Sequence, residues 1–119
     1  MDVIKDFMSK PVWSVAVQAT AEETAKEMDQ QGVSCLLVKE NEEHIGLVTT
    51  SDLVKRVMAK GLNAKTIKIN LIMSKPLISL NHYLARSDAN ELMKKNKIKH
   101  VAVTEQNSVI GILTPKDMI

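Results

Sequence analysis

Aromatic residues are almost absent from this chain of 119 residues, which contains one Trp, one Tyr and one Phe. Since 45% of the residues are hydrophobic, the core must be built from aliphatic side chains and from the seven Met. Surfaces that bind nucleic acid combine basic runs with exposed aromatic rings, and the sequence has neither. We therefore do not expect nucleic acid among the partners.

Cysteine and long hydrophobic runs are scarce as well. Cys35 is the only cysteine, which excludes an intrachain disulfide and a metal site rich in cysteine. No apolar run approaches the roughly 20 residues that a membrane-spanning helix requires, and the first residues do not resemble a secretion signal. These absences predict a soluble cytoplasmic protein that does not associate with a membrane.

Recognisable catalytic motifs are missing too. The sequence has no Gly-x-Gly-x-x-Gly and no P-loop, and His44, His82 and His100 do not show the spacing of metal ligands. Cys35 lies in an apolar run, where a thiol is expected to be buried and unreactive. We expect no catalytic residue, no metal site and no required cofactor, so the chain is predicted not to be an enzyme.

The two halves of the sequence differ in charge, although the net charge is only +2. Residues 1–60 contain 7 Lys or Arg and 10 Asp or Glu, which gives −3, whereas residues 61–119 contain 9 and 4, which gives +5. The excess of cations in the second half favours an anionic ligand such as a phosphate. Four of these cations lie close together in the sequence: Lys94, Lys95, Lys97 and Lys99. They either form a solvated surface or attract phosphate by their combined positive charge.

What the sequence does contain is a repeat. The segment GLVTTSD at residues 46–52 returns 65 residues later as GILTPKD at 111–117, and MSKP at 8–11 returns at 73–76. The same offset needs no gap and aligns residues of several physical kinds, which composition alone would not produce. The chain is therefore an internal duplication, and two half-domains that share a core are favoured over two independent domains.

Each copy predicts the same order of elements: an apolar lead, a short strand, a helix, two strands that form a hairpin, and a final helix. The first helix has a strong start signal, because Thr20 and Glu23 form a capping box, and Gly32 is placed to end it. The final helix of the second copy hardly begins before Ile119, so we expect it to be truncated. The expected strands are 12–15, 33–38, 45–49, 77–80, 98–104 and 109–114, and the other helices are 21–31, 52–60 and 84–95.

This ordered set, present twice, resembles the CBS domain, and two such domains in tandem resemble a Bateman module. The resemblance rests on the Met-Ser-x-Pro lead, the helix, the strand pair and the Gly-hydrophobic-x-Thr-x-x-Asp that opens the last helix. It covers essentially the whole chain and implies an α+β (α/β) fold, in which each repeat forms a small three-stranded sheet with two helices. The sheets are expected to pack together about a pseudo-twofold axis, with repeats at 1–61 and 69–119 and a linker at 62–68.

The resemblance also implies a function. Members of the family commonly hold adenosine-containing ligands such as AMP, ADP, ATP or S-adenosylmethionine in two clefts between the repeats, and pairs of modules often form a flat dimer. Some members bind no nucleotide. We expect a regulatory module that binds an adenine nucleotide and forms a homodimer. The alternative is a ligand-free module for dimerisation or for docking on an unidentified effector protein, such as an enzyme or a transporter.

The Thr-x-x-Asp motif suggests how such a ligand would be recognised. The carboxylates of Asp52 and Asp117 could each accept hydrogen bonds from both hydroxyls of a ribose, at about 1.5–3 kcal/mol for each bond to a charged group. Thr49 and Thr114 place a hydroxyl at the helix entrance, where an anion is favoured. The motif is also an ordinary helix cap, and Pro115 occupies a favoured first helical position. Both roles can hold at once.

Three further residues are assigned by the resemblance. Ser51 and Lys116, next to the two aspartates, are expected to contact phosphate. His100 heads a strand where family members often carry a His or Arg that faces the phosphates, although a solvated residue at a strand end is the alternative. Its counterpart in the first copy is Cys35, which cannot supply that charge. The two clefts are therefore expected to differ, and the alternatives are that one cleft or both are occupied.

Overall fold

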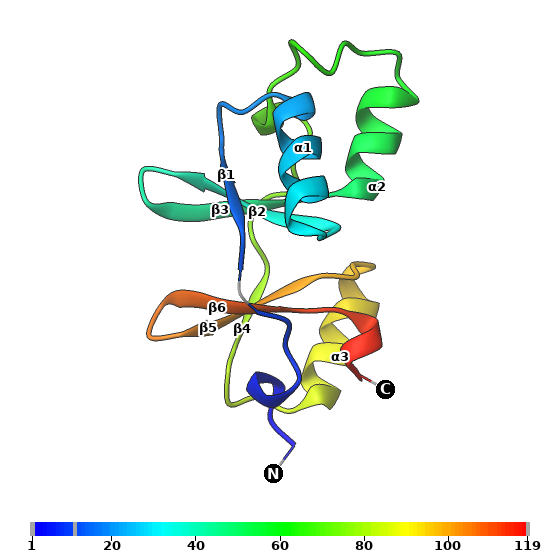
Figure 1. The fold of residues 1–119 in the computed structure, drawn as a ribbon. Helices are drawn as coiled ribbons and strands as arrows, with labels where there is room; N and C mark the ends of the chain where they lie inside the picture. The colour runs from blue at the N-terminus through cyan, green and yellow to red at the C-terminus, as the bar shows by residue number, and fades with distance from the viewer. Residues whose placement is uncertain (1, 11, 119) are drawn as a thin grey trace. The chain divides into compact units, whose positions relative to one another are not determined.

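The structure is a computed structural model that describes residues 2–10 and 12–118. The backbone forms two compact units (Figure 1). The first unit is Trp13–Leu77, and the second unit combines Met1–Val12 with Ile78–Ile119. Two positions of the sequence analysis lie outside the described residues, namely Pro11 of the first lead and Ile119 of the truncated helix.

The first unit contains a three-stranded sheet in the order β1-β2-β3. The strand β1 (Ser14–Ala16) pairs in parallel with β2 (Cys35–Glu40), which pairs in antiparallel fashion with β3 (Glu43–Thr49). Helix α1 (Ala21–Gln31) and helix α2 (Thr50–Leu53) cover the same face of this sheet (Figure 1).

The boundaries of α1 follow from local signals in the sequence. Thr20 Oγ1 accepts a hydrogen bond from the amide of Glu23 at 3.1 Å, and the Glu23 carboxylate accepts one from the amide of Thr20 at 2.8 Å. Gly32 closes the helix in the left-handed region, with φ of 67°. The predicted capping box and glycine end are both confirmed.

Helix α2 differs from its prediction. The α-helical part is Thr50–Leu53, and the chain continues as a π-helical turn at Val54–Met58 instead of an α-helix to residue 60. The wider turn is closed by the amide of Ala59, which donates to the carbonyl of Val54 at 2.8 Å. The prediction was wrong about the helix type because the pattern of apolar residues does not separate these two closely related periods.

The second unit repeats the plan of the first. Its sheet has the order β4-β5-β6, with β4 (Ser79–Asn81) parallel to β5 (Val101–Glu105) and β5 antiparallel to β6 (Ser108–Leu113). Helix α3 (Arg86–Asn96) lies against this sheet, and a 3₁₀ turn occupies Pro115–Met118 where the truncated helix was expected. The two three-stranded sheets and three helices confirm the α+β prediction.

The duplication extends to small irregularities of the backbone. A β-bulge lies between Val38 and Lys39 in the first unit and between Val103 and Thr104 in the second. The two hairpins turn through pairs of residues with positive φ, at residues 41–42 and 106–107. Each feature recurs at the offset of 65 residues that was found in the sequence.

The strands at 35–40 and 101–105 begin two or three residues later than predicted. The apolar residues before them belong to the ends of the preceding helices. The amide of Val33 donates to the carbonyl of Met28, and the amide of Ile98 donates to that of Met93, both at 3.0 Å. These bonds close the last helical turn, so the strand can only start after it.

The leads are exchanged between the repeats, which the sequence did not predict. Val3 and Ser9 of the first lead pair with Ala85 and Ile112, whereas Lys68 and Ser74 of the second lead pair with Thr20 and Leu47. Ile4 is fully buried in the core of the second unit, and Ile69 is fully buried in the core of the first. Each compact unit therefore contains the lead that precedes the other repeat.

The glycines that open the repeated segment make this exchange possible. A Cβ atom at Gly46 would lie 2.7 Å from the carbonyl oxygen of Ser74, and one at Gly111 would collide with the side chain of Met8. The missing Cβ lets the backbone of the second lead approach Gly46 closely, and at Gly111 it leaves room for the side chain of Met8. Within the described residues, no helix is long and apolar enough to cross a membrane.

Candidate functional site

The repeated Thr-x-x-Asp forms a helix cap in the first unit. Thr49 Oγ1 accepts a hydrogen bond from the amide of Asp52 at 3.2 Å, and Asp52 Oδ2 accepts one from the amide of Thr49 at 3.0 Å. The Asp52 side chain is 14% exposed. The capping interpretation is therefore confirmed, and it leaves Asp52 Oδ1 outside the cap.

The second carboxylate oxygen of Asp52 faces Arg56, one helical turn further along the chain. Asp52 Oδ1 lies 3.7 Å from Arg56 Nε, and the Arg56 side chain is 50% exposed. The same guanidinium donates through Nη1 to the carbonyl oxygens of Ile72 at 3.0 Å and Met73 at 3.4 Å. Sequence reasoning did not identify Arg56, although an acid and a base four residues apart on a helix is a recognised pairing signal.

The second unit uses the same motif in a tighter turn. Asp117 Oδ2 accepts a hydrogen bond from the amide of Thr114 at 2.9 Å and another from the Thr114 hydroxyl at 3.1 Å. The amide of Asp117 donates to the carbonyl of Thr114 at 3.0 Å, as expected for the 3₁₀ turn. Asp52 in the first unit and Asp117 in the second are thus both partly buried, and each is held through its Oδ2 atom.

The other predicted residues lie near these caps. Ser51 and Lys116 are exposed beside their aspartates. Val101 pairs with Leu113, so His100 and Thr114 flank this pair at the same end of the hairpin. The structure thus places three predicted residues of the second repeat, His100, Thr114 and Asp117, in one part of the second unit.

Cys35 occupies the position in the first unit that His100 occupies in the second. It pairs with Thr49 across the hairpin. Burial raises the pKa of the Cys35 thiol to about 12, and the negative charge of Asp52 contributes to the same effect. The thiol is therefore protonated at neutral pH, and in this neutral form it adds no positive charge for an anion.

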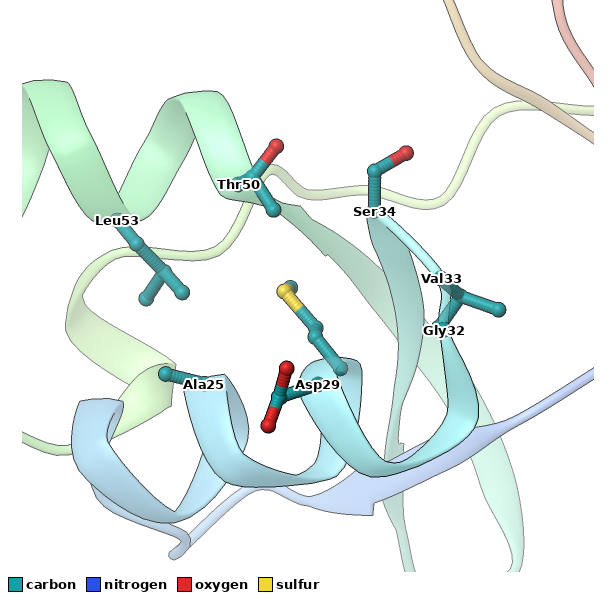
Figure 2. A pocket seen from close by; sticks show the side chains of 8 residues that line it. Ala25, Asp29, Gly32, Val33, Ser34, Thr50 and Leu53 are labelled. Atoms are coloured by element: carbon teal, nitrogen blue, oxygen red, sulfur yellow. The ribbon is translucent and has the colours of Figure 1, made fainter.

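A pocket of about 480 Å³ lies between α1 and α2 in the first unit (Figure 2). Its walls come from α1, from the turn after α1 and from the first turn of α2. Apolar side chains line the pocket together with polar ones: Ala25, Met28, Val33 and Leu53 are apolar, and Asp29, Ser34 and Thr50 add polar atoms. None of the predicted ligand residues lines this pocket, and the sequence analysis did not anticipate it.

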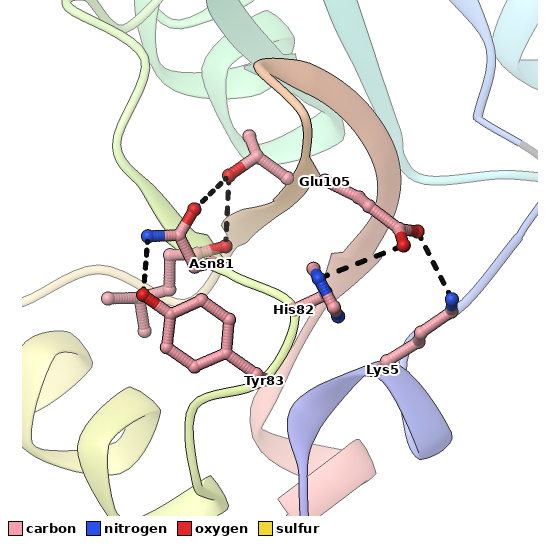
Figure 3. Close-up of polar contacts among 7 residues, drawn as sticks. Lys5, Asn81, His82, Tyr83 and Glu105 are labelled. Carbon is pink, nitrogen blue, oxygen red and sulfur yellow. Dashed lines mark hydrogen bonds and ion pairs between the residues drawn. The ribbon is translucent and has the colours of Figure 1, made fainter.

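A polar cluster in the second unit was also missed (Figure 3). Glu105 accepts a hydrogen bond from Lys5 Nζ at 3.1 Å, and its other oxygen lies 3.7 Å from His82 Nε2. The hydrogen bond and positive charge of Lys5, together with the nearby His82, hold the pKa of the Glu105 carboxyl below its ordinary value. Lys5 belongs to the exchanged lead, so this cluster fastens the lead to the sheet.

Among residues 2–10 and 12–118, no group of three His, Cys, Asp or Glu side chains could hold a metal ion. The caps formed by Thr49 with Asp52 and by Thr114 with Asp117 present carboxylates and hydroxyls, which suit hydrogen bonding to a ligand that carries hydroxyl groups.

The repeats match a known family. The family model for the CBS domain matches the chain twice, over residues 4–59 and 67–119. The chain is also 30% identical over 118 residues to the CBS domain-containing protein YhcV of Bacillus subtilis. That match covers 99% of this chain and 84% of YhcV.

Two other similar proteins are larger than this chain. The solved structure of the hexameric CBS-CP12 protein from bloom-forming cyanobacteria has a TM-score of 0.92 and 26% identity, and the match covers 99% of this chain and 69% of that one. Inosine-5'-monophosphate dehydrogenase of Methanocaldococcus jannaschii is 28% identical over 116 residues. This match covers 96% of the chain but only 22% of the dehydrogenase.

Proposed function

Since this chain belongs to the CBS domain family and contains two CBS domains in tandem, we propose that it is a regulatory module that binds an adenosine-containing nucleotide. The observation that carries the proposal is the state of Asp52 and Asp117. Each carboxylate is partly buried and fixed through Oδ2 at the start of a helical turn. The candidate ligands are AMP, ADP, ATP and S-adenosylmethionine.

A carboxylate fixed in this way suits the recognition of a ribose. The cap holds one oxygen, so the rotation of the side chain is restricted before the ligand arrives and less entropy is lost on binding. The remaining lone pairs can accept hydrogen bonds from ribose hydroxyls. Lys116 and Ser51 then serve as phosphate contacts, and His100 serves the same purpose when protonated.

The regulatory part of the proposal follows from thermodynamic linkage. A ligand shifts the protein towards the arrangement that it binds more tightly, and the size of the shift is limited by the difference between the two affinities. The bound state would then be read by an effector protein or by a second copy of the chain. The larger size of the CBS-CP12 protein and of the dehydrogenase is consistent with CBS pairs that act beside other segments.

Calorimetric titration of the purified chain with AMP, ADP, ATP and S-adenosylmethionine tests the proposal. We expect Asp52→Asn and Asp117→Asn to weaken binding of the preferred ligand, and the variant with the larger effect identifies the principal site. Glu23→Gln is the matched control, because Glu23 is also a capping carboxylate in a Thr-x-x-acid motif. No binding heat with any of the four ligands, or an equal loss in Glu23→Gln, would contradict the proposal.

The second candidate function is a ligand-free interaction module. It is favoured by apolar side chains that remain exposed at and after the end of α2, namely Val54 at 56%, Met58 at 74% and Leu62 at 46%. The CBS-CP12 protein is hexameric, so a relative does self-associate. Sedimentation equilibrium separates the candidates, because association that is unchanged by nucleotide, in a chain that binds none, supports this second function.

A further inference from the structure

Arg56 is in contact with both the proposed ligand group and the exchanged lead. Its Nε lies 3.7 Å from Asp52 Oδ1, while its Nη1 donates to the carbonyls of Ile72 and Met73. These carbonyls belong to the chain just after the 3₁₀ turn Ile69–Leu71. Nε and Nη1 belong to the same rigid, planar guanidinium group, so a displacement of Nε also displaces Nη1.

The lead that Arg56 touches is anchored to the sheet by a small number of backbone bonds. Ser74 and Leu47 exchange two hydrogen bonds, at 2.8 and 3.0 Å, and the amide of Met73 donates to the carbonyl of Ile69 at 2.9 Å. The side chains of Ile72 and Met73 are buried in the core of the first unit. A change in how firmly Arg56 holds the two carbonyls would therefore alter the opening of these amides to solvent.

We propose that Arg56 is a positioning residue that links Asp52 to the second lead, so that a ligand bound at Asp52 is sensed by residues 69–74. The inference rests on the proposed function, because it assumes that Asp52 contacts the ligand. A ligand bound at the preformed Asp52 carboxylate restricts the half-exposed Arg56 side chain beside it. Arg56 in turn holds the lead, so ligand binding and closure of the lead share the entropy cost of ordering the Arg56 side chain. By reciprocity, a lead that is already closed favours the binding-ready carboxylate.

Hydrogen exchange measured by NMR tests the link, with the amides of Met73 and Ser74 as reporters. The nucleotide that binds most tightly in the calorimetric titration is added to saturation. We then expect the exchange of these two amides to slow by about fivefold, because one half-exposed ion pair stabilises the closed lead only modestly. In Arg56→Met the nucleotide should still bind, but the slowing should be lost. The amide of Val17 donates to the carbonyl of Lys39 at the opposite edge of the same sheet. Its exchange rate should not change with nucleotide in either protein.

Lys55→Met is the matched control for the loss of a positive charge. Lys55 is the exposed neighbour of Arg56, and among the described residues no hydrogen bond or ion pair joins its side chain to the lead. Arg56→Lys keeps the charge but replaces the planar fork by a single ammonium group. We expect Lys55→Met to behave as the parent chain, and Arg56→Lys to lose most of the nucleotide-dependent slowing. A full response in Arg56→Met would overturn the inference.

A second measurement, without nucleotide, separates a failure of this inference from a failure of the proposed function. Asp52→Asn should release Arg56 and accelerate exchange at Ser74, and adding Arg56→Met should produce little further change. Effects that simply multiply in the double variant would show that no link exists. If the link is present but no nucleotide binds, the proposed ligand is wrong and the sensing role falls with it.

Discussion

The two units share the strand order, the β-bulges and the hairpin turns of their sheets, but they have different side chains where their helices and hairpins begin and end. The first unit has Gly32 after α1 and Cys35 at the start of the hairpin, where the second has Lys97 and His100. The bulges and turn conformations nevertheless recur at the same offset. The comparison shows that duplication preserved the geometry of the main chain, whereas the charge at the candidate sites was free to diverge.

Charge divergence affects the two candidate sites in opposite ways. In the first unit, the neighbour of Thr49 is a neutral, partly buried thiol, and the Asp52 carboxylate is balanced by Arg56. In the second unit, His100 flanks the strand pair beside Thr114, and Lys116 adds a positive charge. We therefore expect phosphate groups to prefer the second unit, so Asp117→Asn should weaken nucleotide binding more than Asp52→Asn.

The largest effects are expected where the comparison rests on the exchanged leads. Ile4→Ala and Ile69→Ala each remove a fully buried side chain, and each should lower the free energy of unfolding by about 2–5 kcal/mol in urea titrations. Because the leads are exchanged, Ile4→Ala should accelerate hydrogen exchange in β5 and β6, and Ile69→Ala should do so in β2 and β3. Acceleration in the opposite sheets would show that the exchange is absent.

Leu71→Ala is the control for these two variants. Leu71 lies in the same 3₁₀ turn as Ile69 but is 70% exposed. Its removal should change the free energy of unfolding by no more than about 0.5 kcal/mol, as is usual for a surface substitution. A cost similar to that of Ile69→Ala would mean that the lead packs in another orientation.

The next effect concerns the two glycines that admit the leads, where the units differ in what a new methyl group meets. Gly46→Ala would press against the backbone carbonyl of Ser74, which has no alternative conformation, whereas Gly111→Ala would press against the flexible side chain of Met8. We expect Gly46→Ala to cost about 1–3 kcal/mol and Gly111→Ala to cost less, by urea titration. The reverse order would show that Met8 is the more rigid obstacle.

A smaller effect is expected at the ends of α1 and α3, where both residues have a left-handed backbone, with φ of 67° at Gly32 and 54° at Lys97. Gly32→Ala should destabilise the chain by about 1 kcal/mol, because an L-residue is strained there and nothing lies within 4 Å to obstruct the new methyl group. Lys97→Gly should stabilise it by a similar amount. Thermal unfolding measures both changes, and a Lys97→Gly variant that is less stable than the parent would contradict the argument.

The order of elements and the first helix could be predicted from the sequence because their signals are local. Thr20, Glu23 and Gly32 lie within one helix length, and a capping box has the same meaning in any fold. The exchange of the leads could not be predicted, because Ile4 and Ile69 occupy equivalent positions in the two repeats and an apolar side chain could enter either core. Periodicity identifies a buried residue but does not say which sheet buries it.

The candidate site shows the same division between local and distant information. The capping role of Asp52 was visible in the sequence, and Arg56 could have been found from its spacing of four residues. The Glu105 cluster could not, because Lys5, His82 and Glu105 lie in three segments that only the exchanged lead brings together. Residues that depend on tertiary contacts carry no spacing signal.

The smallest effect is a pH dependence that should occur in the second unit because of this cluster. The corresponding positions of the first unit are Asn70, Val17 and Glu40, which cannot form the same set of ion pairs. The pKa of Glu105 is lowered from its ordinary value of 4.5 mainly by the hydrogen bond from Lys5. A carboxyl whose pKa is lowered by folding stabilises the fold above 4.5, and this contribution disappears as the pH falls through the lowered value.

Titration of the Glu105 carboxyl by NMR measures this effect directly. We expect its pKa to lie below 4.5 in the parent chain and to move towards 4.5 in Lys5→Met, since the variant removes both the hydrogen bond and the positive charge. Lys10→Met is the control, because Lys10 belongs to the same lead and is exposed. The Glu105 side chain is 36% exposed and its ion pair is screened by water, so the accompanying change in acid stability should be slight. An unchanged pKa in Lys5→Met would show that the lead is not fastened to the sheet through Glu105, and the burial of Ile4 would then be the main restraint on that lead.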